Sequence, residues 1–205
     1  MKFEQLLKLL NGEIIFSSSM LLVGGESINV IRKQLTRWAS NGKLIQLRRG
    51  IYAVAQPYKD MQPHPFLIAN MMRRASYVSL QSALAYFGII PEYVPITTSV
   101  TTGRSEEITM KAGRFQFRHT KKGLFWGYRE IEVSSGIKVF IALPEKSLLD
   151  LIYLTPQSDS MDYLEELRLQ NNERIDTKIL MDFAEKFKAP KISRAAVRII
   201  SLIKE

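Results

Sequence analysis

The sequence predicts an α+β fold organised as two domains, on the basis of three observations. Residues 27–54 combine a cationic amphipathic helix with two short strands. Residues 94–142 are rich in β-branched side chains and alternate as strands do. From Pro144 onward the apolar spacing is helical to the end of the chain. This order predicts a small N-terminal domain, then a larger α+β domain with a mid-chain sheet and C-terminal helices.

The N-terminal helix begins at Ser27, whose hydroxyl can accept a backbone N–H of the first turn. A shorter helix over residues 17–23 and the turn Gly24-Gly25 precede it, as in a helix-turn-helix pair. Five apolar residues share one stripe: Ile28, Ile31, Leu35, Trp38 and Ala39. The opposite side carries Asn29, Lys33, Thr36, Arg37 and Ser40. Since residues 27–52 include no acidic side chain, this outward face suits a polyanion.

A basic hairpin follows the helix, which ends at the turn-forming pair Asn41-Gly42. Residues 43–47 predict a strand, Arg48-Arg49-Gly50 a tight turn and residues 51–54 the return strand. This order of elements is that of a winged helix-turn-helix domain, which binds duplex DNA. We expect eight residues to contact DNA: Asn29, Lys33, Thr36, Arg37, Ser40, Lys43, Arg48 and Arg49. The first three should reach base edges, whereas Arg48 and Arg49 should contact phosphates or the minor groove.

Composition narrows the class of protein. The 205 residues are 46% hydrophobic and carry a formal net charge of +9, which favours anionic partners. Residues 1–57 hold eight basic and three acidic side chains, so over half of the excess lies in about a quarter of the chain. No apolar run approaches the ~18 residues of a membrane span and no signal peptide opens the chain, so a cytoplasmic location is expected. The absence of cysteine excludes disulfides, thiol nucleophiles and thiolate metal sites.

A domain boundary is expected within residues 56–65, where Pro57, Pro63 and Pro65 interrupt regular structure. The predicted domains are therefore 1–57 and 58–205. In the second domain, helices are expected over 66–75 and 79–87, then strands over 94–102, 114–118, 128–133 and 138–141, the last two joined by Ser134-Ser135-Gly136. Further helices are expected over 145–154, 161–169, 177–186 and 192–203.

Three motifs resemble those of the AbiEi antitoxins of bacterial abortive-infection type IV toxin–antitoxin systems. The wing ending Leu47-Arg48-Arg49-Gly50-Ile51-Tyr52 is similar to the family's R-x-x-R-G-x-Y pattern. Tyr77-Val78-Ser79-Leu80-Gln81-Ser82-Ala83-Leu84, followed by Phe87-Gly88, is similar to its Y-(I/V)-S-x-x-S-A-L…G helix. Pro144-Glu145-Lys146-Ser147-Leu148-Leu149-Asp150-Leu151 is similar to its P-E-K-A-L-L-D helix, with Ser147 where alanine is usual.

The resemblance implies an antitoxin that represses its own operon and is not an enzyme. It implies binding of double-stranded promoter DNA at inverted repeats through the winged helix. It also implies neutralisation of a cognate nucleotidyltransferase-type toxin through the C-terminal domain, by a protein that is a monomer in solution. Neither a cofactor nor a metal is expected, and the wing is short for the family.

The two C-terminal motifs also have an architectural interpretation. Pro144 suits a helix start and Glu145 its first turn. Glu145, Lys146 and Asp150 resemble a catalytic cluster, but an apolar helix stripe explains the segment better. Ser79 fits an N-cap and Ser82 a close-packing position better than a nucleophile, because no histidine is assigned as its base.

A basic and aromatic strip over residues 111–138 is a second candidate interface, with seven basic and two acidic side chains. On a strand, Phe115 and Phe117 point to one face and Arg114 and Arg118 to the other. With Lys121 and Lys122, these arginines would contact an acidic toxin surface or a second length of nucleic acid. A solvated sheet face with its aromatics in the core explains the same pattern equally well.

Other functional classes have weaker support. The glycines form neither a Walker loop nor a dinucleotide fingerprint, and His64 and His119 are too isolated for a metal site. The strongest enzymatic alternative is a metal-dependent nuclease using Glu130, Glu132 and Lys138, whose spacing is poor. A stand-alone winged-helix regulator with a sensing or oligomerisation domain is the other alternative, and the absence of an adjacent toxin gene would favour it.

Overall fold

The computed structural model describes residues 1–24, 27–58, 63–134 and 136–204, which form two compact units, Met1–Arg74 and Ala75–Glu205. The division falls later than the expected boundary at residues 56–65. Helix α3 (Pro65–Met72) accounts for the difference, because it packs against strands β1 and β2 of the first unit. Gly25 of the expected first turn and Ser135 of the expected hairpin lie outside the described residues.

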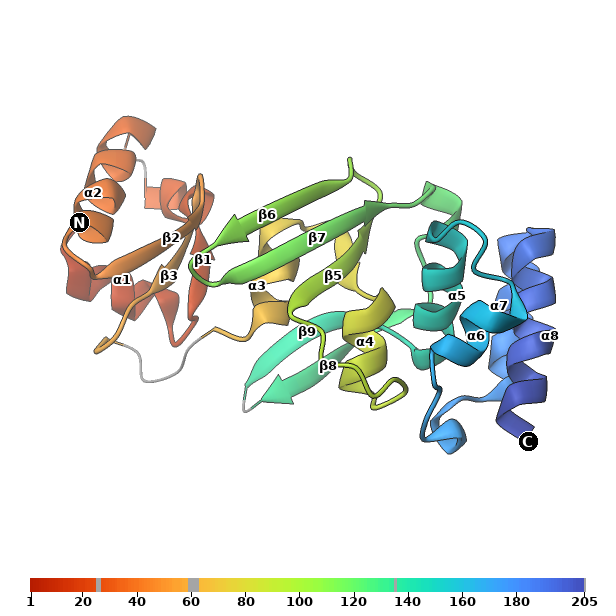
Figure 1. The fold of residues 1–205 in the computed structure, drawn as a ribbon. Coiled ribbons are helices and arrows are strands. Elements are labelled where there is room, and N and C mark those ends of the chain that lie inside the picture. The colour runs from red at the N-terminus through yellow and green to blue at the C-terminus, as the bar shows by residue number, and fades with distance from the viewer. Residues whose placement is uncertain (25–26, 59–62, 135, 205) are drawn as a thin grey trace. The chain divides into compact units, whose positions relative to one another are not determined.

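Unit 1 has the winged helix-turn-helix arrangement predicted from the sequence (Figure 1). Its elements before α3 are α1 (Phe3–Leu10), β1 (Ile15–Ser17), the 3-10 helix η1 (Ser18–Gly24), α2 (Ile28–Ser40), β2 (Leu44–Arg48) and β3 (Ile51–Val54). The strands form an antiparallel sheet in the order β1-β3-β2, in which Tyr52 pairs with both Phe16 and Gln46. The core combines the inner faces of helices and sheet: Phe3, Leu6, Leu10, Phe16, Leu21, Ile31, Leu35, Trp38, Leu44, Tyr52 and Val54.

Three details of unit 1 differ from expectation. Ser27 is the N-cap residue of α2, but its side chain makes no capping hydrogen bond. The buried stripe of α2 is narrower than predicted, because Ile28 is 38% exposed while Ile31, Leu35 and Trp38 are buried. The expected first helix is a 3-10 helix, and α1 and β1 were not expected at all.

Unit 2 is an α+β fold, as predicted, and its mixed sheet has six strands where the sequence indicated four. The sheet-forming part runs β4 (Ser76–Val78), α4 (Leu80–Tyr86), β5 (Ile96–Thr101), β6 (Glu106–Met110), β7 (Gly113–His119), η2 (Lys122–Leu124), β8 (Tyr128–Ser134) and β9 (Ile137–Ala142). The strand order is β6-β7-β5-β4-β9-β8, with parallel pairs β5·β7 and β4·β9. Strands β4 and β6 were not predicted individually. The short β4 is central, so it brings the 77–84 motif against the start of the C-terminal helices.

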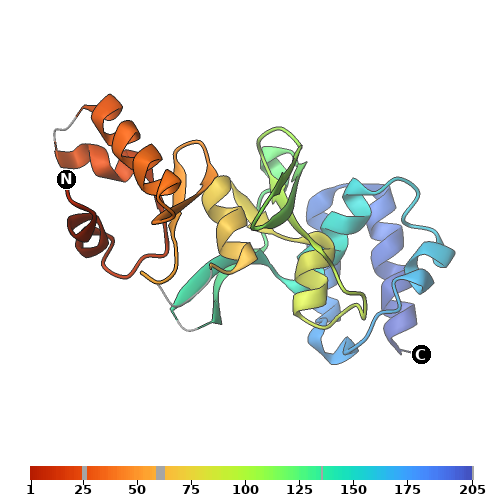
Figure 2. The same ribbon diagram turned by 60° about the vertical axis from the view of Figure 1, so that its left-hand side comes forward.

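The C-terminal helices are α5 (Pro144–Leu154), α6 (Met161–Glu166), α7 (Thr177–Phe187) and α8 (Pro190–Lys204), with η3 (Asn172–Arg174) between α6 and α7. Helix α5 packs against α4, α7 and α8, and the helices lie side by side in both views (Figures 1 and 2). Leu148, Leu149 and Ile152 of α5 are fully buried at this junction. Among the described residues, no helix is both long and apolar enough to cross a membrane.

Candidate nucleic-acid interface

The outward face of α2 is the surface that the sequence predicted. Five of its polar side chains are exposed: Asn29, Lys33, Thr36, Arg37 and Ser40. The Ser40 hydroxyl donates to the Thr36 carbonyl at 3.0 Å, so part of its hydrogen-bonding capacity is used within the helix. This face thus presents the cations Lys33 and Arg37 to solvent, together with Asn29 and Thr36, whose side chains form no hydrogen bond with a described residue.

The remaining predicted contacts do not all join this face. The Lys43 Nζ lies 5.0 Å from the Phe3 ring centroid and 5.7 Å from that of Tyr58, and the side chain is half-buried. These cation–π contacts stabilise the packing of α1. Arg48 is also half-buried, whereas Arg49 at the hairpin turn is exposed. Of the three hairpin cations, Arg49 is therefore the best placed for an external ligand.

A cleft of about 440 Å³ separates α2 from the hairpin. Arg32 and Thr36 line it from the helix, and Gln46, Arg49 and Tyr52 from the strands and turn. The guanidinium groups of Arg32 and Arg49 form no ion pair or hydrogen bond with any residue that the structure describes. Burial raises the pKa of the Tyr52 hydroxyl and the positive charge of Arg32 lowers it, so the field of Arg32 reaches into the cleft.

The hairpin turn is held in place by its glycine. Gly50 has a φ of +83°, which favours glycine, and a Cβ there would lie 3.2 Å from the Ser18 Oγ. The backbone N–H of Ser18 donates to the Gly50 carbonyl at 2.8 Å, so the start of η1 is joined to the turn. A bulge between Gln46 and Arg48 bends strand β2 beside it. Arg49 is therefore presented from an anchored turn.

Arg32 is the site residue that the sequence interpretation missed. It lies beside the apolar stripe, not opposite it, and was therefore not counted on the outward face. Its spacing from Thr36 is one helical turn, which was an available signal because both residues then face the same neighbour. Two guanidinium groups that have no described partner and a threonine hydroxyl can donate several hydrogen bonds to one anion, and arginine matches phosphate geometry. The cleft is thus chemically suited to a phosphodiester.

The two C-terminal motifs meet in a buried polar cluster. The Lys146 ammonium of α5 pairs with the Asp150 carboxylate and donates to the Tyr77 hydroxyl at 3.0 Å. Tyr77 and Ser79 donate to Asp150 Oδ2 at 3.0 and 2.9 Å. Ser79 is thus at the N-cap position of α4, but its hydroxyl binds Asp150 and makes no capping bond. The motif residues join β4 to α5.

The surroundings of this cluster exclude a ligand. Lys146 and Asp150 have 0% and 1% of their side-chain surface exposed, and the Lys146 Nζ lies 5.0 Å from the Trp126 ring centroid and 4.9 Å from that of Phe187. Burial lowers the pKa of Lys146 and raises that of Asp150, while the charge of each partner opposes its shift. A pair so enclosed touches no substrate, which supports the architectural interpretation of this motif.

Neighbouring motif residues have separate structural roles. Glu145 Oε1 accepts the backbone N–H of Asp176 at 2.8 Å, just before α7, and burial raises the pKa of this carboxyl. The Ser82 Oγ accepts the Thr98 N–H at 2.8 Å and donates to the Ile96 carbonyl at 2.9 Å, so it joins α4 to β5. Glu145 therefore lies outside the buried cluster that contains Lys146 and Asp150.

The basic strip of unit 2 is partly committed to internal contacts. Arg114 pairs with Glu107 at 2.8 Å, and the Arg118 Nη2 donates to the Leu154 carbonyl at 2.6 Å. Phe115 and Phe117 have no exposed surface, as the strand alternation predicted. Lys121 and Lys122 are exposed, and their ammonium groups form no hydrogen bond or ion pair with a described residue. Two of the four candidate cations are thus open to a partner.

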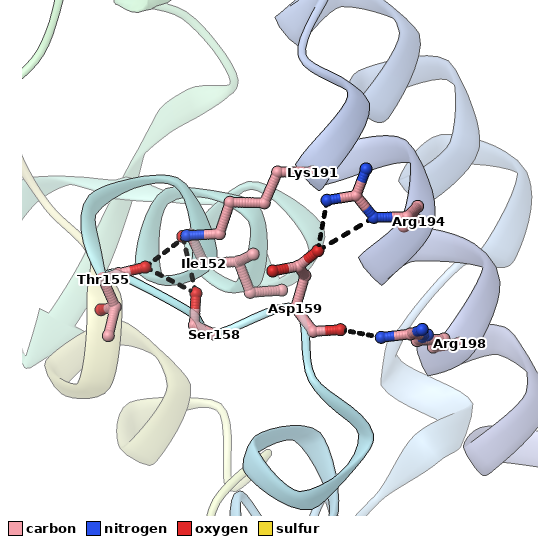
Figure 3. Close-up of polar contacts among 7 residues, drawn as sticks. All are labelled: Ile152, Thr155, Ser158, Asp159, Lys191, Arg194 and Arg198. Atoms are coloured by element: carbon pink, nitrogen blue, oxygen red, sulfur yellow. Dashed lines mark hydrogen bonds and ion pairs between the residues drawn. The ribbon is translucent and has the colours of Figure 1, made fainter.

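Three cations of α8, Lys191, Arg194 and Arg198, are also committed to internal contacts (Figure 3). The Lys191 Nζ donates to the carbonyls of Ile152, at 2.8 Å, and Thr155, where α5 ends, which satisfies C-terminal helix carbonyls. Arg194 donates to Asp159 Oδ2 at 3.0 and 2.7 Å, and hydrogen bonding to Arg194 lowers the pKa of Asp159. Arg198 donates to the Asp159 carbonyl. These side chains hold the α5–α6 connection against α8.

The residues of the alternative nuclease site lie together on the outer hairpin. Lys138 pairs with Glu130 at 3.5 Å, and Glu132 Oε1 accepts the Gly136 N–H at 2.9 Å. Among the described residues, no three His, Asp or Glu side chains are grouped to hold a metal ion. His119 Nδ1 lies 2.8 Å from the Gly103 carbonyl oxygen, and His64 Nδ1 accepts the Phe66 N–H at 3.2 Å.

No family model and no curated protein matches the chain. Among solved structures, it is similar to the crystal structure of the RV2827C protein from Mycobacterium tuberculosis, with a TM-score of 0.57. The two chains are 13% identical, over 97% of this chain and 76% of that one. At this identity the similarity shows a shared fold.

Proposed function

We propose that this protein is an antitoxin and transcriptional autorepressor of a bacterial type IV toxin–antitoxin operon. The observation that carries the DNA-binding part is the cleft between α2 and the hairpin, where Arg32 and Arg49 lie unpaired among the described residues beside an acid-free helix face. The antitoxin part rests on the three sequence motifs.

The two arginines and the exposed face of α2 would have different roles in DNA recognition. Arg32 and Arg49 would bind backbone phosphates, which supply affinity without sequence information. Asn29, Lys33 and Thr36 lie in the N-terminal and middle turns of the exposed helix, where a recognition helix contacts base edges. A monomer would bind each half of an inverted repeat. A cytoplasmic location follows from this role.

The DNA-binding proposal is tested by fluorescence anisotropy titrations of the promoter at several salt concentrations. Removing one cation that neutralises a phosphate should reduce the slope of log affinity against log salt by about 0.9, so Arg32→Ala/Arg49→Ala should reduce it by about 1.8. Lys8→Ala removes an exposed cation of α1 outside the cleft and should leave the slope unchanged. Equal slopes for the unaltered protein and both variants would contradict the proposal.

Base reading is tested separately by comparing promoter and scrambled DNA. Asn29→Ala or Lys33→Ala should reduce the difference in binding free energy between the two DNAs by about 1–3 kcal/mol for each base that the side chain reads. Equal losses on both DNAs would show that α2 positions the protein without reading sequence.

Neutralisation is tested by growth rescue of cells that express the proposed cognate nucleotidyltransferase-type toxin. Full-length Arg32→Ala/Arg49→Ala should still rescue growth, because neutralisation is assigned to unit 2. The charge reversals Lys121→Glu and Lys122→Glu test the basic strip as the contact surface. Arg114→Glu and Arg118→Glu are poorer probes, because they also remove internal contacts. Loss of rescue in the DNA-binding variant would refute the division of labour.

A further inference from the structure

A pocket of about 470 Å³ in unit 2 lies apart from the basic strip. Ile90, Tyr163 and Leu167 provide most of its apolar lining. Gln81, Glu92, Glu166 and Arg168 provide its polar rim. Its volume falls within the range of sites that receive a small molecule or a large side chain.

The pocket is preformed by bonds between its two sides. The Gln170 N–H donates to the Ile89 carbonyl at 2.8 Å, and the Asn171 side-chain amide donates to the Gly88 carbonyl at 2.7 Å. Gly88 has a φ of +67°, and a Cβ there would lie 3.0 Å from the Asn171 Nδ2. The glycine of the Phe87-Gly88 motif therefore permits this close approach. A rigid rim reduces the entropy that binding costs.

Arg168 occupies the rim in an unfavourable backbone conformation. Its φ is +48°, just after the C-terminus of α6, where glycine is usual. The Arg168 Nε donates to Glu92 Oε1 at 3.1 Å, so its guanidinium is held against that carboxylate. Strain at a pocket rim is a feature of binding sites. The Glu92–Arg168 pair leaves this part of the rim neutral.

Of the other two rim residues, Gln81 is neutral and Glu166 is acidic, in a chain whose net charge is +9. Asp162 does not line the pocket, but it is exposed and lies one helical turn before the exposed rim residue Glu166 on α6. No described cation pairs with either carboxylate. Phosphate groups are repelled from such a rim, whereas a protein surface with lysine or arginine beside an apolar side chain is complementary to it.

We propose that this pocket is the toxin-contact site, in which it receives an apolar side chain of the toxin while Asp162 and Glu166 face neighbouring toxin cations. This inference rests on the proposed antitoxin function. A nucleotidyltransferase binds phosphates and therefore has a cationic surface around its substrates. Tyr93, next to Glu92 and 89% exposed, adds an aromatic anchor of the kind that dominates interface energies.

The test measures the affinity of the full-length protein for the proposed cognate nucleotidyltransferase-type toxin by calorimetry. Glu166→Lys should weaken binding at least tenfold, and Gln81→Trp, which fills the pocket without a charge change, should do the same. Glu185→Lys makes the same charge reversal on an exposed α7 residue outside the pocket and should leave affinity within twofold. Operator affinity should be unchanged in all three variants, and thermal melts followed by circular dichroism should match the unaltered protein, which verifies that unit 2 is folded.

The outcomes separate this inference from the proposed function. If the unaltered protein binds and neutralises the nucleotidyltransferase but Glu166→Lys and Gln81→Trp bind it normally, the pocket is refuted and the antitoxin function stands. Loss of binding only in Lys121→Glu/Lys122→Glu would assign contact to the basic strip and overturn the pocket. Concentration-dependent dimers that Glu166→Lys abolishes would make a second copy the occupant and overturn the toxin assignment. No binding by the unaltered protein would overturn both proposals.

Discussion

The buried Lys146–Asp150 pair gives a stability prediction with a definite magnitude. Lys146→Met removes the ion pair and the bond to Tyr77, and leaves the Asp150 carboxylate with two neutral hydroxyl donors. Removing one partner of a buried pair costs about 3–5 kcal/mol, because the other charge stays buried without compensation. With a urea dependence of about 2 kcal/mol per M, the unfolding midpoint of unit 2 should fall by roughly 2 M.

The partner variants make this prediction specific. Lys146→Met/Asp150→Leu leaves neither charge buried and leaves only the neutral Tyr77 and Ser79 hydroxyls without their acceptor, so its cost should fall to about 1–3 kcal/mol, below that of Lys146→Met alone. Tyr77→Phe removes one hydroxyl donor and should cost about 1–3 kcal/mol. Lys138→Met breaks the exposed pair with Glu130, whose side chains are 63% and 49% exposed, and should cost no more than about 1 kcal/mol.

Tryptophan fluorescence during urea unfolding is the assay. Trp126 lies 5.0 Å from the Lys146 Nζ and reports on unit 2, and a Trp38→Phe background removes the signal of unit 1. The reasoning would be refuted if Lys146→Met cost less than about 1 kcal/mol. It would also be refuted if the destabilisation of the double variant equalled the sum of the two single values, because the pair would then have no coupling.

Two further predictions concern the pH dependence of the stability of unit 1 and the packing of Gly127 against Lys146. Burial lowers the pKa of His64, whose Nδ1 accepts the Phe66 N–H at the start of α3, so folded unit 1 binds fewer protons than its unfolded chain in mild acid. The stability of unit 1 should therefore fall as the pH drops from about 6.5 through the lowered pKa, and it should be constant above about pH 6.5. Urea unfolding midpoints measured across this pH range should show a smaller slope for His64→Asn than for the unaltered protein. Gly127 has a φ of +75°, and a Cβ there would lie 3.0–3.2 Å from three Lys146 carbons. Gly127→Ala should cost about 3 kcal/mol, against about 1–2 for Gly136→Ala, where φ is +73° but the space is open; equal losses in thermal melts would exclude a role for Lys146 packing.

The sequence predicted those parts of the fold whose signals are local. Helix α2 and its hairpin were recognisable from apolar spacing, a glycine turn and the absence of acids within one short segment. The edge residue Ile28 was misplaced, because periodicity gives the direction of a stripe but not its width. Strand β4 was missed because its three residues carry too short a pattern, although the strand is central to the sheet.

The polar contacts of the motif residues were beyond sequence reasoning for a different reason. Tyr77 and Asp150 are 73 positions apart, and each is compatible with many partners until the sheet order is known. The same holds for Arg32, whose role depends on which side of α2 the hairpin occupies. A motif thus identified the segments that matter, whereas tertiary packing determined the pairing of their side chains.

Charge count alone is a poor guide to the interfaces of this protein, because pairing decides which cations reach a ligand. In unit 2, Arg114, Arg118 and Lys146 contact a carboxylate or a carbonyl of the same chain, as do the basic residues of α8 drawn in Figure 3. An arginine already bound to a carbonyl gives up that bond when it contacts a phosphate, so its net gain is small. Arg32 and Arg49 give up no such bond with a described residue. The free energy of phosphate binding should therefore be concentrated in unit 1, even though unit 2, residues 75–205, contains eighteen of the twenty-nine basic side chains.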